Sequence, residues 1–232
     1  MTYKKPLAAL VALSLTSSVA LADALGLHIG AGHWQNEPEG TLYDISLNDL
    51  NYKQSDNRFF YAAFEHPVPL LPNIRVQYNE LSHKGSGAAN NIPLSSRTDV
   101  SYTDAIGYYE LLDNWISLDL GIGLRRYEGD STVATGDTTL YKDNVDSYLP
   151  TIYGDANFDL PFTGFSVGGR FQGGSYDDTE FTEYSARVSY MIDSIPSVGA
   201  ELGYKKQNLS RVKGLDLDAE YTGPYIAIKG HF

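Results

Sequence analysis

The stretch that decides the fold is WISLDLGIGLRRYE, residues 115–128. Within it Ile116, Leu118, Leu120, Ile122 and Leu124 share one parity, and serine, aspartate, glycine and arginine occupy the other. Successive side chains of a β-strand point to opposite faces, whereas a helix repeats every 3.6 residues. The period of two therefore predicts a strand with one apolar and one polar face.

The same alternation recurs along the chain, most clearly in residues 147–160 and 182–192. A strand of about 9 to 11 residues is long enough to cross a bilayer when it is tilted. Ten stretches reach this length, and they are residues 25–34, 58–66, 73–82, 98–110, 115–128, 147–160, 165–175, 182–192, 198–207 and 219–232. We predict an all-β fold, a closed antiparallel barrel of about ten strands. Eight or twelve strands remain possible, because Leu42 and Leu47 hint at extra β structure in residues 35–57.

The connections between these stretches alternate in length. Four are tight and rich in proline or Asx residues, which suit turns: residues 67–72, 111–114, 161–164 and 193–197. Five are longer and polar: residues 35–57, 83–97, 129–146, 176–181 and 208–218. Short periplasmic turns and long extracellular loops are typical of bacterial outer-membrane barrels. An even strand number would place both termini on the periplasmic side.

Alternation alone does not say which face is inside, because a soluble barrel is apolar inside and a membrane barrel is apolar outside. The chain has 18 Tyr, 9 Phe and 2 Trp, many of them near predicted strand ends. One group lies toward the long loops: Trp34, Phe59, Tyr78, Tyr102, Tyr127, Tyr148 and Tyr204. The other lies toward the short turns: Phe64, Tyr108, Trp115, Phe162, Phe165, Tyr190 and Phe232. Two aromatic belts fit two membrane interfaces, so the sequence favours a membrane barrel.

The N-terminus has the pattern of a secretory signal peptide. Two lysines precede an apolar stretch, and small residues end at Ala22 before Asp23. We expect residues 1–22 to be a cleaved signal peptide and residues 23–232 to form a single barrel domain. The net charge of −12 makes nucleic acid an unsuitable partner. With no cysteine, the chain has no disulfide, thiolate nucleophile or lipid-acceptor cysteine.

If the apolar face meets lipid, the polar face lines the lumen and gathers acids and bases in equal number. The acids are Glu65, Asp119, Asp155, Asp159, Glu183 and Glu201, and the bases are Arg75, Arg125, Arg170, Arg187, Lys205 and Lys229. Charges at this depth are costly unless they are paired or hydrated, so we expect mutual neutralisation. The turn at residues 161–164 places Asp155 opposite Arg170 on adjacent strands. The turn at residues 193–197 brings Arg187 near Glu201.

Two places disturb the alternation. Asp104 falls among Val100, Tyr102 and Ile106, and Gly223-Pro224 interrupts the last stretch. A β-bulge would explain either one.

The C-terminal segment GPYIAIKGHF, residues 223–232, resembles the signal by which outer-membrane barrels are recognised for insertion, through Ile226, Ile228 and Phe232. The run EHPVPLLPN, residues 65–73, resembles an uncharacterised family of outer-membrane β-barrel proteins of Gram-negative bacteria. Further matching stretches are residues 26–35, 111–125, 160–169 and 223–232. The resemblance implies an integral outer-membrane location and this architecture, and it implies no activity.

No catalytic constellation is recognisable, so we expect no enzymatic function and no cofactor or metal. The five histidines, His28, His33, His66, His83 and His231, accompany no nucleophile motif. The acidic outer loops match no calcium-binding spacing. A lipid- or peptide-directed enzyme stays as a minor alternative.

About ten strands make a barrel that is only slightly wider than one filled by side chains. We therefore expect a structural role, or a narrow passage for ions or small solutes, with a largely ion-paired lumen. The alternative is a cell-surface protein that binds through its acidic outer loops. Expected partners are outer-membrane lipid including lipopolysaccharide, the barrel-insertion machinery and periplasmic chaperones.

Overall fold

The structure is a computed structural model that describes residues 25–68, 70–192 and 195–232. The predicted cleavage site between Ala22 and Asp23 lies outside the described residues, so it stays a prediction. Among the described residues, no helix is long and apolar enough to cross a membrane.

The described chain is almost entirely β-strand. The strands are β1 (Gly26–Leu42), β2 (Ile45–Ser46), β3 (Ser55–Glu65), β4 (Asn73–Asn79), β5 (Ser82–Ala89), β6 (Ile92–Asp99), β7 (Tyr102–Asp113), β8 (Ile116–Thr135), β9 (Thr138–Asp159), β10 (Phe165–Tyr176), β11 (Thr179–Ile192), β12 (Ser197–Val212) and β13 (Leu215–His231). Ten of them form a closed antiparallel ring in the order β1, β13, β12, β11, β10, β9, β8, β7, β4 and β3, with β3 paired back to β1. The predicted ten-stranded barrel is confirmed, and β2, β5 and β6 are additions above it.

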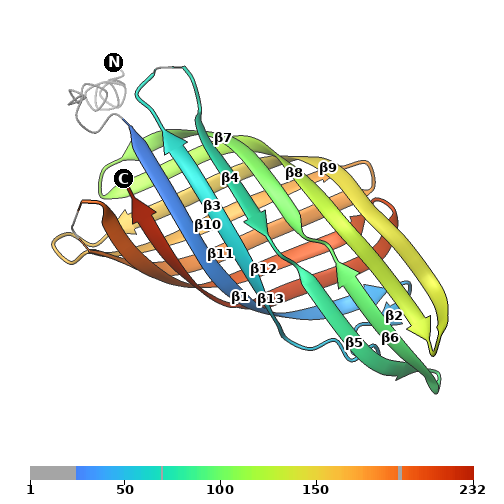
Figure 1. The fold of residues 1–232 in the computed structure, drawn as a ribbon. Coiled ribbons are helices and arrows are strands. Elements are labelled where there is room, and N and C mark those ends of the chain that lie inside the picture. Colours follow the sequence, from blue (N-terminus) through green and yellow to red (C-terminus); the bar gives the residue numbers. More distant parts are fainter. Residues whose placement is uncertain (1–24, 69, 193–194) are drawn as a thin grey trace, which may run out of the picture.

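The ring closes between the first and last strands. Eleven consecutive register pairs, from Gly26 with Glu65 to Asn36 with Ser55, join β1 to β3, and β13 pairs with the other edge of β1. Leu27 and Phe232 exchange both backbone hydrogen bonds, at 3.1 and 3.0 Å. Figure 1 shows the last strand beside the first, with the start of β1 and the end of β13 at the same end of the barrel.

Four of the five long connections are β-hairpins and not irregular loops, which corrects the sequence prediction for them. Strands β8 and β9 run for 20 and 22 residues, about twice the length that a membrane crossing needs. Residues 83–97, expected as a loop, form the β5/β6 hairpin, and residues 129–146, 176–181 and 208–218 are mainly extensions of wall strands. In the connection 35–57, β1 continues to Leu42 and β2 follows, but residues 47–54 contain no strand. In Figure 1 these hairpins project at the end of the barrel opposite the start of β1.

Tight turns make these extensions possible. Asn90 and Asn91 at the tip of β5/β6 have φ of 50° and 66°, and Asp177 and Asp178 at the tip of β10/β11 have φ of 48° and 62°. Two-residue hairpin turns of this kind need positive φ at both positions, which Asn and Asp tolerate better than other side chains. The polar composition of these segments suggests loops, whereas their Asn-Asn and Asp-Asp pairs form the tips of tight hairpins.

The barrel exterior carries an apolar belt. It comprises exposed side chains such as Ile29, Phe60, Ile122, Val188 and Ile228. Charged side chains begin directly above it on the exterior: Arg58, Glu80, Arg126, Asp146, Glu180, Lys206 and Glu220. The belt defines the membrane-spanning part, and the strands above this charged ring, including β5 and β6, stand outside the membrane.

The aromatic belts are partly as predicted. Tyr78, Tyr148 and Tyr204 point outward near the upper edge of the belt. Outward-facing aromatics near the lower edge include Phe64, Trp115, Phe165, Tyr190 and Phe232. Five residues assigned to the belts instead point into the barrel: Trp34, Phe59, Tyr102, Tyr108 and Tyr127. Their neighbours on the same faces include buried Asp104 and Arg125, so these faces line the lumen.

Neither predicted bulge is present. On β7, Tyr102, Asp104, Ile106 and Tyr108 all point inward in regular alternation. Along β13 the register with β12 runs unbroken through Gly223 and Pro224. Val100, Tyr102 and Ile106 face the lumen together with Asp104, because the lumen contains apolar side chains as well as polar ones.

Candidate functional site in the barrel lumen

The lower half of the lumen, near the short turns, contains a network of five charged residues that we call the lower network: Asp155, Arg170, Arg187, Glu201 and Lys229. They come from five consecutive strands, β9 to β13. Arg170 Nε donates to Asp155 Oδ2 at 2.7 Å, and Arg187 Nη1 donates to the same oxygen at 3.0 Å. Glu201 Oε2 lies 3.7 Å from Arg187 Nε and 3.6 Å from Lys229 Nζ.

Strand register explains this network. Asp155 stands directly opposite Arg170, which is the predicted register, and Glu201 stands opposite Ser189, two residues from Arg187. Side chains opposite or diagonal on one face of neighbouring strands come within reach. Tyr225 adds a hydrogen bond to Glu201 at 2.7 Å. The lower network therefore links five of the ten wall strands through side chains inside the barrel.

A second cluster, the upper network, lies higher in the lumen and consists of Tyr102, Asp104, Arg125 and Glu183. Arg125 donates twice to Asp104, at 2.7 and 2.9 Å, and both side chains are 0% exposed. Glu183 lies 3.4 Å from Arg125 and accepts a hydrogen bond from Tyr102 at 2.7 Å. The guanidinium is 3.8 Å from the ring centres of both Tyr102 and Phe181. Arg125 is thus paired, stacked and excluded from water.

Two predicted bases are held by neutral groups. Arg75 lies 3.9 Å over the ring of Tyr61 and donates to Gln77 at 3.0 Å. Lys205 lies 3.9 Å over the ring of Trp34 and 3.3 Å from Asn79 Oδ1. Cation–π contacts and amide oxygens stabilise a buried cation without a carboxylate.

The remaining predicted acids lie at or near the lower mouth. Glu65 accepts hydrogen bonds from Tyr108 at 2.8 Å and contacts His28 at 2.9 Å, and His28 stacks on His231. Asp119 faces Asp155 in register. Asp159, the last residue of β9, has the inward parity of Asp155 but is exposed at the rim, where it accepts a hydrogen bond from Asn157.

The upper half of the lumen differs from the expected polar channel. It is filled by apolar side chains, including Trp34, Leu42, Leu81, Leu149, Leu209 and Leu217, each at most 1% exposed. Leu47, Leu50 and Tyr52 fold in from the connection between β1 and β3. We call this cluster the apolar plug. The ion pairs therefore occupy the membrane-level lumen, and the part outside the membrane has the interior of a soluble protein.

His83 on β5 lies within the apolar plug. The centre of its ring lies 5.3 Å from the ring centre of Tyr221 and 6.3 Å from that of Tyr52. Among the described residues its Nε2 is buried without a hydrogen-bond partner. Burial lowers the pKa of His83 to about 4, against a smaller opposing effect of a hydrogen bond to the backbone of Asn36. His83 is therefore neutral at pH 7.

Sequence reasoning missed three lumen residues. Asp104 interrupts an apolar face in the sequence, and only the inward orientation of Tyr102, Ile106 and Tyr108 in the structure places it in the lumen. His28 shares the parity of Trp34 and was not assigned to the lumen. Phe181 fell in a predicted loop, and only the extension of β11 to Thr179 brings it inside.

The predicted insertion-signal residues lie on the exterior of β13. Ile226, Ile228 and Phe232 are all more than half exposed, on the outward face of the barrel. No cluster of three or more potential metal-ligating side chains occurs in the described part of the chain.

No family model and no curated protein matches the chain. The family-level resemblance of residues 65–73 and the other stretches therefore stays a prediction. Solved structures match over nearly the whole chain, at low identity. The translocator domain of autotransporter NalP from Neisseria meningitidis is 9% identical, with 97% of this chain and 93% of that chain covered and a TM-score of 0.46.

Two further solved structures are also similar to this chain. The transport unit of autotransporter AIDA-I from Escherichia coli is 10% identical, with 94% and 92% covered and a TM-score of 0.45. Neisserial surface protein A is 13% identical, with 90% and 97% covered and a TM-score of 0.37. The closed ring and the apolar exterior belt make this chain an integral, ten-stranded β-barrel of the outer membrane.

Proposed function

We propose that this protein is a closed structural barrel that anchors a rigid β-cylinder on the cell surface. The observation that carries the proposal is the apolar plug, because its side chains fill the lumen above the membrane. Packing at the density of a protein interior leaves little space for water. A conducting path needs continuous water or polar lining, and the plug supplies neither.

The strand extensions support the surface role. The surplus of about ten residues in β8 and in β9, at about 3.3 Å per residue, carries the hairpins on the order of 30 Å above the belt. Salt bridges brace their exterior, such as Arg126 with Asp146 at 3.0 Å and Lys206 with Glu220 at 2.7 Å. Such a stiff projection suits contact with other molecules at the surface, and the acidic tips favour cationic partners. We propose no catalytic role.

The partners follow from the same proposal. The belt lies in outer-membrane lipid, which we expect to include lipopolysaccharide. The exterior row of Ile226, Ile228 and Phe232 is the surface that we expect the barrel-insertion machinery to recognise.

The test is conductance of the purified barrel in planar bilayers, with a general porin as positive control. We expect no conductance steps from the protein at neutral pH. Reproducible steps whose ion selectivity changes in the Arg125→Ala variant would overturn the structural role and support the narrow ion passage instead.

A further inference from the structure

The barrel wall splits on one side, between β9 and β10. Their pairing runs from Asp159 with Ser166 to Ile152 with Gly173 and stops there. Above that point β9 continues along β8 as far as Thr138, and β10 continues along β11 as far as Tyr176. The two hairpins therefore diverge near the upper edge of the apolar belt.

Pro150 explains the split. A Cβ on Gly174 would lie 2.2 Å from the Pro150 carbonyl oxygen, so this carbonyl points toward β10. In a hydrogen-bonded antiparallel pair, the N–H and C=O of one residue point to the same neighbour. Proline has no N–H, so the donor that would extend the β9/β10 ladder is missing. The sequence itself thus terminates the pairing.

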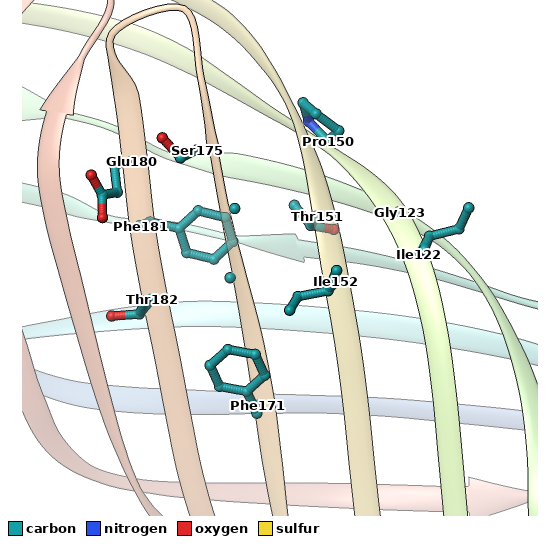
Figure 2. A pocket seen from close by; sticks show the side chains of 12 residues that line it. Ile122, Gly123, Pro150, Thr151, Ile152, Phe171, Ser175, Glu180, Phe181 and Thr182 are labelled. Carbon is teal, nitrogen blue, oxygen red and sulfur yellow. The ribbon is translucent and has the colours of Figure 1, made fainter.

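The split creates a groove of about 620 Å³ on the barrel exterior. Figure 2 shows Ile122 and Ile152 on one side of the groove, Phe171 on the other and the ring of Phe181 between the strands. Gly173 and Gly174 lie along it and leave the space open. The volume falls within the usual range for small-molecule sites, about 300 to 1,000 Å³.

The groove is continuous with the membrane-facing belt. Ile122 and Ile152 are belt residues, 73% and 58% exposed, so lipid hydrocarbon already contacts the entrance. Phe181, which is 1% exposed, closes the inner side and stacks on Arg125, so the groove ends at the lumen wall. An occupant must enter from the bilayer, and the lining demands an apolar chain.

The upper end of the groove is polar. Ser175, Glu180 and Thr182 line it at the level where exterior charges begin. Within the described residues, Glu180 forms no ion pair, and its register partners are Ser175 and Ser210. A lone carboxylate favours a cationic group above the chain and disfavours an anionic one.

From these observations we propose that the groove is a binding site for one membrane lipid, with an acyl chain between Ile152 and Phe171 and an ammonium headgroup at Glu180. The hydroxyls of Ser175 and Thr182 can donate hydrogen bonds to the ester region. Phe181 keeps the acyl chain apart from the upper network.

The test compares lipid retention in matched variants. The barrel is reconstituted in vesicles of equal parts phosphatidylethanolamine and phosphatidylglycerol, extracted into mild detergent, and its bound lipid is counted by native mass spectrometry. We expect one retained lipid, with phosphatidylethanolamine favoured a few-fold, as a partly exposed ion pair allows. Gly173→Leu fills the groove and should abolish retention.

Gly169→Leu is the matched control, since Gly169 lies on the same strand and exterior face but outside the groove. A gel shift between unboiled and boiled samples establishes that each variant is folded. Phe171→Ala removes one wall without filling space and should weaken retention. Glu180→Gln should keep the lipid and lose the headgroup preference.

Two results would overturn the proposal. One is a barrel that retains no lipid after extraction, and the other is equal retention by Gly173→Leu and Gly169→Leu. Preference for phosphatidylglycerol that Glu180→Gln leaves unchanged would overturn the assignment of the ammonium headgroup.

Discussion

At the scale of single residues, the Asp104–Arg125 pair is the most sensitive point of the lumen. Removing one partner of a buried ion pair leaves an uncompensated charge and costs about 3 to 5 kcal/mol. We expect Asp104→Ala to lower the free energy of unfolding by about that amount. Asp159→Ala should change it by less than about 0.5 kcal/mol, because Asp159 is exposed. Urea unfolding in vesicles measures both, and similar losses in the two variants would contradict a buried, essential pair.

His83 makes a separate prediction about acid. Its pKa is about 4 in the folded protein and about 6.5 in an unfolded chain, so the unfolded state binds the proton first. Stability contributed by neutral His83 is complete above pH 6.5 and declines as the pH falls toward 4, by about 3 kcal/mol in total. His83→Phe should flatten this part of the pH profile, whereas the exposed His33→Phe should not. Parallel profiles for the protein and His83→Phe would show that His83 is not buried as neutral imidazole.

At the scale of elements, the hairpin tips depend on residues that accept positive φ. Asp178 has φ of 62°, where a β-branched side chain costs about 1 to 3 kcal/mol. Asp178→Val should therefore loosen the β10/β11 hairpin, and Asp178→Gly should leave it intact. Hydrogen exchange of amides near the tip reports the difference. Equal protection in the two variants would mean that backbone conformation does not govern this turn.

The elements also show where sequence reasoning succeeds. The strand alternation at residues 115–128 and the turn at residues 161–164 were enough to give a strand and the register of Asp155 with Arg170. The extensions were missed because solvated strands above a membrane are polar outside, and polarity was interpreted as loop. Pro150 within a strand was a visible signal of a broken ladder.

At the scale of the whole molecule, the ten-stranded ring and the outward apolar face were predictable. The reason is that apolar and polar residues alternate in stretch after stretch, and that short and long connections alternate between the stretches. The composition of the lumen was only half predictable. Lys205 and Arg75 were expected in ion pairs, yet Lys205 lies over the ring of Trp34, on a strand distant in sequence, and Arg75 lies over the ring of Tyr61 on the neighbouring strand. The apolar plug was not predicted, since an apolar residue in alternation looks the same whether it faces lipid or a packed interior.

The long hairpins determine how this barrel can enter its membrane. The start of β1 and the end of β13 lie at the short-turn end, so every tip must cross the hydrocarbon before the barrel wall closes. The tips carry Asp137, Asp177, Asp178 and Lys213, and an aspartate or lysine at mid-bilayer costs about 2.5 to 3.5 kcal/mol. The same charges that slow this translocation also oppose its reversal. Once assembled, the cylinder is kinetically trapped in one orientation, with its acidic end held outside by the barrier that it crossed.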